Sequence, residues 1–294
     1  MKTIVTHSGS MHPDDIVAVA ILKILFPESD VVRTRDETVI SAADFAVDVG
    51  AVYDPVTNRF DHHQVGGAGV RDNGIPYSAC GLVWKHYGMQ LCSHEVELYE
   101  EIENKIILPT DAADNSVRIY SSSLRIPVFD LSMIVKTMRP TWKEIKADPT
   151  VIDKAFTELV EYTIKLISRI IQKHRDVKLC EPDILDVYNS AEDKRYLVCE
   201  FPVSKHSFWT MKSRIPEVRF CIAQAEEDSW YVIAQKDSHG GFLALPPVEW
   251  RGKRGEELEC VSGVIGACFC HSVGFYMDAI SREAAIEMVQ RSLV

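Results

Sequence analysis

Short apolar runs alternate with an amphipathic stretch in the first part of the chain. The runs at 2–6, 31–33 and 45–49 are rich in β-formers, while apolar positions from 14 to 26 recur at helical spacing. Strands and helices that alternate in this way favour βαβ units. The pattern therefore predicts an α/β fold with a mostly parallel sheet flanked by helices.

Three longer helices are expected beyond this sheet. The first begins after Ser78 and stops at Gly88, the second covers about 94–108, and the third runs from Thr150 to about 174. The glycine-rich segment 65–74 is too flexible for the interior of a helix or strand and is a candidate lid.

The pattern changes after about residue 180. Short strands are predicted at 196–201, 218–223 and 230–234, and a last helix begins at Ser281. We therefore expect two domains, with the boundary after residue 180. Residues 1–180 form the larger one, and residues 181–294 form a smaller α+β domain.

Composition is that of an ordinary globular protein, with 294 residues of which 46% are hydrophobic and 26% charged. No apolar run is long enough for a membrane span, and the N-terminus lacks the features of a signal peptide. The eight cysteines include no CxxC pair, so we expect reduced thiols. Together these features predict a cytoplasmic protein with no membrane partner.

The net charge of −11 argues against a broad surface for long duplex nucleic acid. It does not exclude phosphate chemistry at one site, because bound divalent cations would reverse the local charge. The net charge therefore limits how large a surface can contact nucleic acid, and it does not decide which reaction the protein catalyses.

Imidazoles and carboxylates gather where the predicted strands end, which is where open α/β sheets place their sites. The candidate metal ligands are His7, His12, Asp14, Asp48, His62 and Asp111. Asp48 lies between two valines, a costly place for a carboxylate unless cations neutralise it, so we expect it to bridge two ions. Asp15, Asp61 and Asp114 could accept hydrogen bonds from ligating imidazoles.

Several motifs resemble those of the DHH phosphoesterase superfamily and, more closely, the melanocyte-proliferating-gene family. The residues that carry the resemblance are His7–Asp15, Arg33–Asp36, Val47–Gly50, Asp61–Gln64, Ser78–Trp84, Asp111–Asn115, Leu245–Pro246, Trp250, Cys270–Phe275 and Ser281–Glu283. The likeness is strong to about residue 120 and looser from 240 onward.

This resemblance implies a DHH-type catalytic domain at 1–180, a substrate-binding domain at 181–294, and a 3′ to 5′ exonuclease acting on RNA. It also implies that His7, His12 and Asp48 hold one ion and that Asp14, Asp48, His62 and Asp111 hold the other. Mn²⁺ is the expected metal, with Mg²⁺, Zn²⁺ or Fe²⁺ as alternatives.

The remaining site residues divide into two groups. Candidate catalytic residues are Asp15, Asp61 and His63, with His63 facing the phosphate. Candidate substrate contacts are Arg35, His271, Gly274 and Arg282. Arg71 is a further candidate, because a guanidinium offers a fork to phosphate oxygens. The family usually has Cys-Asp-Glu where this chain has Pro13-Asp14-Asp15, so the carboxylate at 15 is one methylene shorter.

The leading hypothesis is a metal-dependent phosphodiesterase that uses metal-activated water on RNA or short oligonucleotides. One alternative is a small-molecule phosphohydrolase, such as a pyrophosphatase or nucleotide phosphatase. Another is a binding protein with a structural metal. A peptidase is disfavoured, because neither an HExxH helix nor a nucleophile elbow is present. The oligomeric state stays open, with a homodimer as one option.

Overall fold

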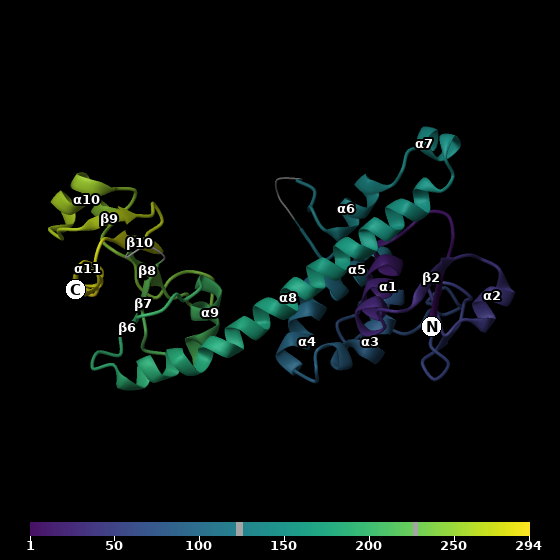
Figure 1. Cartoon of the computed structure of the whole chain (residues 1–294), viewed down its shortest axis with the longest axis horizontal. Helices are drawn as coiled ribbons and strands as arrows, with labels where there is room; N and C mark the ends of the chain where they lie inside the picture. The colour runs from purple at the N-terminus through teal and green to yellow at the C-terminus, as the bar shows by residue number, and fades with distance from the viewer. Residues whose placement is uncertain (122–125, 226–228) are drawn as a thin grey trace. The chain divides into compact units, whose positions relative to one another are not determined.

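The computed structural model describes residues 1–121, 126–225 and 229–294 and divides the chain into two compact units, Met1–Gln172 and Lys173–Val294. The division falls within the long helix α8, Val151–Ser190 (Figure 1). It comes before the boundary expected after residue 180, which stays a prediction, and the helix expected to end near 174 continues to Ser190.

Unit 1 contains a five-stranded sheet with the order β2-β1-β3-β5-β4. Its strands are β1 (Thr3–Thr6), β2 (Asp30–Arg33), β3 (Phe45–Val47), β4 (Tyr53–Asp54) and β5 (Arg59–Phe60). β2, β1, β3 and β5 are parallel, and only the edge strand β4 is antiparallel. The predicted α/β class with a mostly parallel sheet is confirmed. The segment 53–60, for which no strand was predicted, contains the short β4 and β5.

Helices cover both faces of this sheet. α1 (Pro13–Leu25) and α3 (Ala79–Leu91) pack on the face that carries Phe45 and Val47. α2 (Glu37–Ala42) packs on the opposite face through Ile40, against Val5 and Ala46. Because successive strand residues point to opposite faces, strands buried on both sides read as continuous apolar runs.

The expected helix at 94–108 is longer than the sequence predicted and is not regular throughout. It comprises α4 (Val96–Ile102), a π-helical turn at Glu103–Ile107 and α5 (Leu108–Asp114). Two shorter helices follow, α6 (Leu131–Met138) and α7 (Trp142–Ala147).

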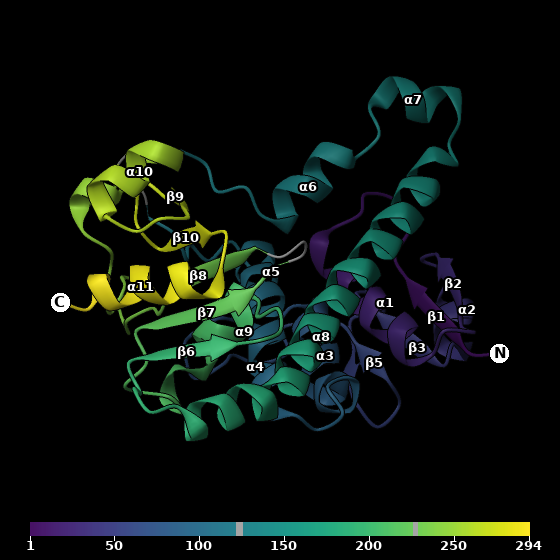
Figure 2. The same ribbon diagram turned by 60° about the vertical axis from the view of Figure 1, so that its left-hand side comes forward.

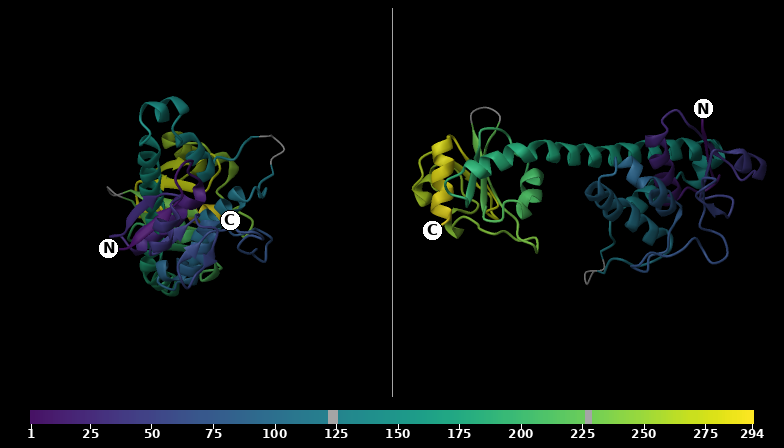
Figure 3. Two further views of the ribbon diagram at one scale, coloured as in Figure 1. Left: turned by 90° about the vertical axis from the view of Figure 1, so that its right-hand side faces the viewer. Right: turned by 90° about the horizontal axis from the view of Figure 1, so that it is seen from below.

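α8 is a single helix of 40 residues that includes Pro182. Figure 3 shows it as one long helix. Proline usually ends or kinks a helix because it lacks the amide hydrogen, but the helix continues past Pro182 to Ser190. Among the described helices, none combines the length and the apolar character that a membrane crossing requires.

Unit 2 contains a second five-stranded sheet, with the order β6-β7-β8-β10-β9 (Figure 2). Its strands are β6 (Tyr196–Cys199), β7 (Phe220–Gln224), β8 (Trp230–Ala234), β9 (Ala267–Cys270) and β10 (Tyr276–Ala279). Only β6 and β7 pair in parallel, and the other neighbours are antiparallel.

The two faces of this sheet pack against different helices. α10 (Gly255–Ser262) and α11 (Arg282–Ser292) cover the face that carries Phe220 and Ile222. α9 (Lys205–Thr210) and the end of α8 cover the face that carries Cys221 and Ala223. Ser281 caps α11 by accepting from Ala284 N, and the helix begins where the sequence predicted.

Gly88 lies inside α3 and does not end it. A Cβ at this position would meet the rings of Trp84 and Tyr99 at 2.7 Å. Two aromatic rings occupy the space that a side chain at position 88 would need. Gly88 is therefore required by packing and does not end the helix.

We expect Gly88→Ala to destabilise the protein. Helix propensity favours alanine by about 1 kcal/mol, whereas overpacking costs about 1–3 kcal/mol, so the melting temperature should fall by a few degrees. The matched control is Gln90→Ala, an exposed position in the same helix, which should leave the melting temperature nearly unchanged. A rise with Gly88→Ala would contradict the packing argument.

Candidate metal centre

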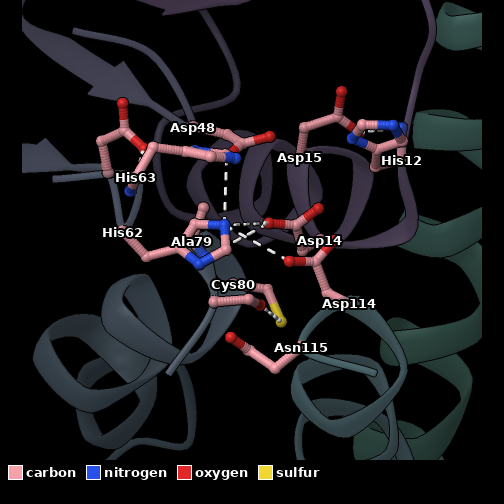
Figure 4. A network of polar contacts seen from close by, with 12 residues as sticks. His12, Asp14, Asp15, Asp48, His62, His63, Ala79, Cys80, Asp114 and Asn115 are labelled. Atoms are coloured by element: carbon pink, nitrogen blue, oxygen red, sulfur yellow. Dashed lines mark hydrogen bonds and ion pairs between the residues drawn. The ribbon is translucent and has the colours of Figure 1, made fainter. Parts of the chain in front are cut away.

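Three neighbouring parallel strands end in the polar residues of one site. His7 follows β1, Asp48 follows β3, and the Asp61-His62-His63 segment follows β5. Because β1, β3 and β5 are parallel neighbours, their carboxyl ends lie at the same edge of the sheet. The start of α1 adds His12, Asp14 and Asp15 from the adjoining turn. The candidate ligands of this edge therefore converge, as Figure 4 shows.

Asp48 is the common partner of three imidazoles. Its carboxylate oxygens lie 3.3 Å from His7 Nε2, 3.5 Å from His62 Nε2 and 3.2 Å from His63 Nδ1. Burial disfavours the charged carboxylate, but these imidazoles outweigh it and hold the pKa of Asp48 below its usual range. Asp48 also has a left-handed backbone, with φ of 54°, while its amide continues the ladder to Phe60 O.

Two further carboxylates surround His62. Its Nε2 lies 3.3 Å from Asp114 Oδ2 and 3.7 Å from Asp14 Oδ2, the contacts drawn in Figure 4. Burial, followed by the nearby charges of Asp48 and Asp114, raises the pKa of Asp14 well above its usual value. Carboxylates crowded in this way repel one another unless protons or cations neutralise them.

The polar atoms of this cluster fit divalent cations. Several of them are buried and lack a hydrogen-bond partner, namely His7 Nε2, Asp14 Oδ1, Asp15 Oδ2, both carboxylate oxygens of Asp48, and His62 Nε2. Buried polar atoms are normally satisfied. Three overlapping groups, each with ligand atoms within 4.8 Å of one another, are His7/His12/Asp48, Asp48/His62/His63 and His12/Asp14/Asp114. Their mixed nitrogen and oxygen donors suit Mn²⁺, Zn²⁺ or Fe²⁺.

The loop between His7 and His12 is held by two arginines that the sequence analysis did not single out for this role. Arg33 Nη2 donates to Gly9 O at 2.8 Å, and Arg139 donates to Met11 O from Nε at 3.0 Å and Nη2 at 2.6 Å. His7 Nδ1 contacts Ser8 O at 3.1 Å, which leaves Nε2 for the cluster. No local pattern reveals these contacts, because both arginines reach across the fold.

The candidate catalytic residues occupy different environments. Asp15 is fully buried, with Oδ1 accepting from His12 N at 3.1 Å and Oδ2 lying 3.1 Å from His7 Nε2. Asp61 is also buried and contacts His63 Nδ1 at 2.8 Å through Oδ1, while its Oδ2 accepts from Ala51 N at 2.6 Å. The His63 side chain is 59% exposed. Asp15 and Asp61 thus orient histidines, and His63 is the member of the three that faces solvent.

Among the described residues, the groups that could hold a metal do not include Asp111, which the second predicted metal set contains. Asp111 Oδ1 accepts from Ser78 N at 3.0 Å, Ser78 Oγ at 2.6 Å and Gly81 N at 3.1 Å, so it caps the start of α3. Its Oδ2 pairs with Arg71 Nη1. Asp114, three residues along α5, takes the place near His62 that Asp111 was expected to fill.

Arg71 is consequently paired with Asp111, although the sequence offered it as a phosphate contact. Its side chain is 8% exposed, pairs with Asp111, and lies over the ring of Tyr77 at 4.0 Å. This pair ties the glycine-rich segment 65–74 to α3 and α5. A bridge between Val70 and Pro76 adds order to the candidate lid.

The candidate substrate residues of unit 2 lie away from the metal residues in sequence. His271 and Gly274 form the turn between β9 and β10, where Gly274 N donates to His271 O at 2.7 Å. Arg282 begins α11 and pairs with Glu200, with Nε 2.9 Å from Oε1. Their predicted contacts with substrate remain predictions.

A pocket of about 600 Å³ opens beside the cluster. Five of the histidines and aspartates described above line it, namely His7, His12, Asp48, Asp61 and His63. Other lining residues come from the segment leading into α2 and from α2 itself, among them Arg35, Glu37, Ile40 and Ser41. Arg35 is thus the predicted substrate residue that the structure places beside the cluster.

These features define an α/β protein in which buried imidazoles and carboxylates that could hold metal ions gather at the carboxyl edge of a parallel sheet. A family model described as "MYG1_exonuc: Uncharacterised protein family (UPF0160)" matches residues 3–293. The chain belongs to this family, which confirms the resemblance read from its motifs. As a member of the MYG1 exonuclease family, it is a hydrolytic enzyme.

Relatives align over nearly the whole chain. The chain is 31% identical to the MYG1 protein of Dictyostelium discoideum, covering 99% of this chain and 96% of that protein. It is 27% identical to the MYG1 exonuclease of Homo sapiens, covering 98% and 85% respectively. RecJ of Thermus thermophilus in complex with Mn²⁺ matches at 13% identity and a TM-score of 0.27, covering 99% of this chain and 51% of that one. The likeness to RecJ is too low to support an argument.

Cation binding to this cluster should release protons and strengthen as the pH rises. Burial disfavours the charged imidazole of His7, but Asp15 and Asp48 outweigh it and raise the pKa of His7 to about 10. A cation must displace that proton, so Mn²⁺ affinity should increase about tenfold per pH unit for each proton released, at pH values below the raised pKa. Calorimetry of Mn²⁺ binding in buffers of different ionisation enthalpy measures this release. Affinity that does not change between about pH 6 and pH 9 would contradict the assignment of His7.

Asp111 and Asp114 should respond differently to the same change. Asp114→Asn should weaken Mn²⁺ binding by about tenfold or more with little loss of stability. Asp111→Asn removes the nearer of the two charge partners of the buried Arg71, which keeps Glu103 at 3.5 Å, and should lower the free energy of unfolding by about 1–3 kcal/mol. Calorimetric Mn²⁺ titration and urea unfolding, run on both variants, separate the two roles. A larger loss of Mn²⁺ affinity with Asp111→Asn would restore the original ligand set.

Proposed function

We propose that this chain is a metal-dependent exonuclease that removes nucleotides from the 3′ end of RNA or short oligonucleotides. The observation that carries the proposal is the convergence of buried imidazole and carboxylate atoms beside an open pocket. The name exonuclease carried by several relatives supports the same reading.

In this proposal His7, His12 and Asp48 hold one cation, and Asp14, Asp48, His62 and Asp114 hold the other. Mn²⁺ is the expected metal, with Mg²⁺, Zn²⁺ or Fe²⁺ as alternatives. Two such ions would neutralise phosphate oxygens and activate a water for in-line attack. Asp48 is the shared residue because its two oxygens face different imidazoles.

The remaining site residues orient an imidazole or bind the substrate. Asp61 fixes the ring of His63 through Nδ1 and leaves the Nε2 edge available for a phosphate oxygen. Arg35 offers a second donor from across the pocket. His271, Gly274 and Arg282 are proposed to contact the strand from unit 2.

The net charge of the chain favours substrates that contact only a small part of its surface. A net charge of −11 disfavours long duplexes, so the proposed substrates are short strands or strand ends. All eight cysteines are free thiols, which supports the proposed cytoplasmic location. A small-molecule phosphohydrolase is the second candidate, because a pocket of about 600 Å³ also accepts a small phosphate ester.

The test is digestion of a 5′-labelled short RNA by metal-stripped protein resupplied with Mn²⁺, Mg²⁺ or Zn²⁺, with pyrophosphate as a parallel substrate. Asp48→Asn and His62→Ala should lower the rate by at least about 100-fold, the upper range for losing a residue that only supports a ligand. Asparagine tolerates the left-handed backbone of position 48, so the fold should survive. The matched controls are Asp183→Asn and His206→Ala, both exposed and outside the site.

The pattern of products decides between the candidates. A metal-dependent ladder that shortens from the 3′ end supports the proposal. Phosphate released from pyrophosphate while the RNA stays intact would favour the small-molecule enzyme. Inertness toward both substrates would return the chain to the class of metal-stabilised binding proteins.

A further inference from the structure

Exposed aromatic side chains gather on one face of unit 1, beside the first half of α8. They are Tyr120, Phe129 and Tyr162, which are 46%, 76% and 47% exposed. Together with the half-buried Leu131 and Leu166, they line a groove of about 370 Å³ between α5, α6 and α8. Single exposed apolar residues are common in soluble proteins, whereas a cluster of them marks a contact site. We propose that this apolar face binds the same face of a second copy of the chain.

The apolar face is large enough to form the centre of a dimer interface. At about 200 Å² for a whole aromatic side chain, its three rings together expose roughly 300 Å². Val128 is 41% exposed in the same groove, and Ile119 and Ile126 line an adjoining hollow that shares Tyr120 with it. With the charged side chains of α8 beside it, this face can supply the roughly 800 Å² that each partner of a stable dimer buries.

The exposed side of α8 beside the groove changes its charge at Tyr162. Glu158 lies one turn before Tyr162, and residues at this spacing share one side of a helix. Lys165 and Arg169 lie about one and two turns after Tyr162 on that side, and Glu161 adds a negative charge before it. All four charged side chains are exposed, and none has an ion pair within the described part of the chain. The exposed side of α8 is therefore acidic before Tyr162 and basic after it.

This order of charges is self-complementary in an antiparallel pair of α8 helices. A two-fold axis beside Tyr162 places the acidic half of one helix opposite the basic half of the other, so Glu158 of one copy meets Lys165 of the other, twice. A parallel pair would bring like charges together. Because the whole chain carries a net charge of −11, two copies repel one another over most of their surface. A face with balanced charges and an apolar centre is therefore the favourable place for two copies to meet.

Sedimentation velocity of the full-length protein over a series of concentrations tests this inference. The wild-type chain should sediment as a dimer of twice 33.2 kDa and should dissociate on dilution. Tyr162→Glu should raise the dissociation constant by at least about 30-fold, because it buries an unpaired charge at the centre of the interface in both copies. The matched control is Val56→Glu, which adds the same charge at an 89% exposed position between β4 and β5 and should leave the dissociation constant unchanged.

Exchange of charges tests the antiparallel alignment at exposed positions, where substitution should leave the fold intact. Lys165→Glu should raise the dissociation constant by about tenfold, since it places like charges opposite one another in both copies. Glu158→Lys, added to the same chain, should recover most of this loss because the pairs are then reversed in sign. Lys85→Glu, at an exposed lysine of α3 that does not line the groove, is the matched control and should have no effect.

The sedimentation results decide whether a second copy covers the apolar face. A dimer that is weakened by Tyr162→Glu and Lys165→Glu, and recovered by the double variant, supports the proposal. A monomer at every concentration would overturn it, because the face then binds something other than a second copy. A dimer that neither single variant weakens would also overturn it, since the two copies would then meet through another surface. A double variant as weak as Lys165→Glu alone would overturn the antiparallel alignment of α8.

Discussion

The shared contacts of Asp48 are the constraint on which the site depends. A buried carboxylate is costly unless it is paired, and this one lies 3.2–3.5 Å from His7, His62 and His63. These histidines come from the ends of two different strands, so the parallel register of β1, β3 and β5 must hold for the charges to balance. The left-handed backbone of Asp48 belongs to the same arrangement, since local strain of this kind persists only where the surroundings fix it. The strand register that forms the sheet therefore also places the charges of the site.

The loop that carries His7 and His12 shows how the rest of the unit supports this arrangement. Its carbonyl groups accept hydrogen bonds from Arg33 on β2 and from Arg139 after α6. Arg33 also pairs with Asp153 of α8 and lies over the ring of Phe156 at 4.6 Å. Backbone carbonyls held by these guanidinium groups are fixed in place, so the imidazoles of the loop keep their spacing. Preorganised ligands of this kind reduce the cost of binding a cation.

The sequence predicted what depends on local patterns. The strand ends before His7 and Asp48 followed from short apolar runs, and the start of the last helix near Ser281 followed from its apolar positions. What it missed depends on distant contacts. Gly88 was expected to end α3, but the rings of Trp84 and Tyr99 determine that position. Arg71 was considered for phosphate, yet it pairs with Asp111 across 40 residues of chain. No periodicity within α3 or the glycine-rich segment carries that information.

Asp114, and not Asp111, lies beside His62 because of the way α5 is rotated about its axis. The two residues are three apart and share a face of the helix, so both point toward the interior of the unit. The π-helical turn at Glu103–Ile107 directly precedes α5, and such a turn shifts the phase of the residues that follow it. In the observed phase, Asp111 meets the amide of Gly81 at the start of α3, and Asp114 meets His62. A regular helix through this region would point the two aspartates in other directions. The π-helical turn therefore determines that Asp111 caps the start of α3 and that Asp114 lies beside His62.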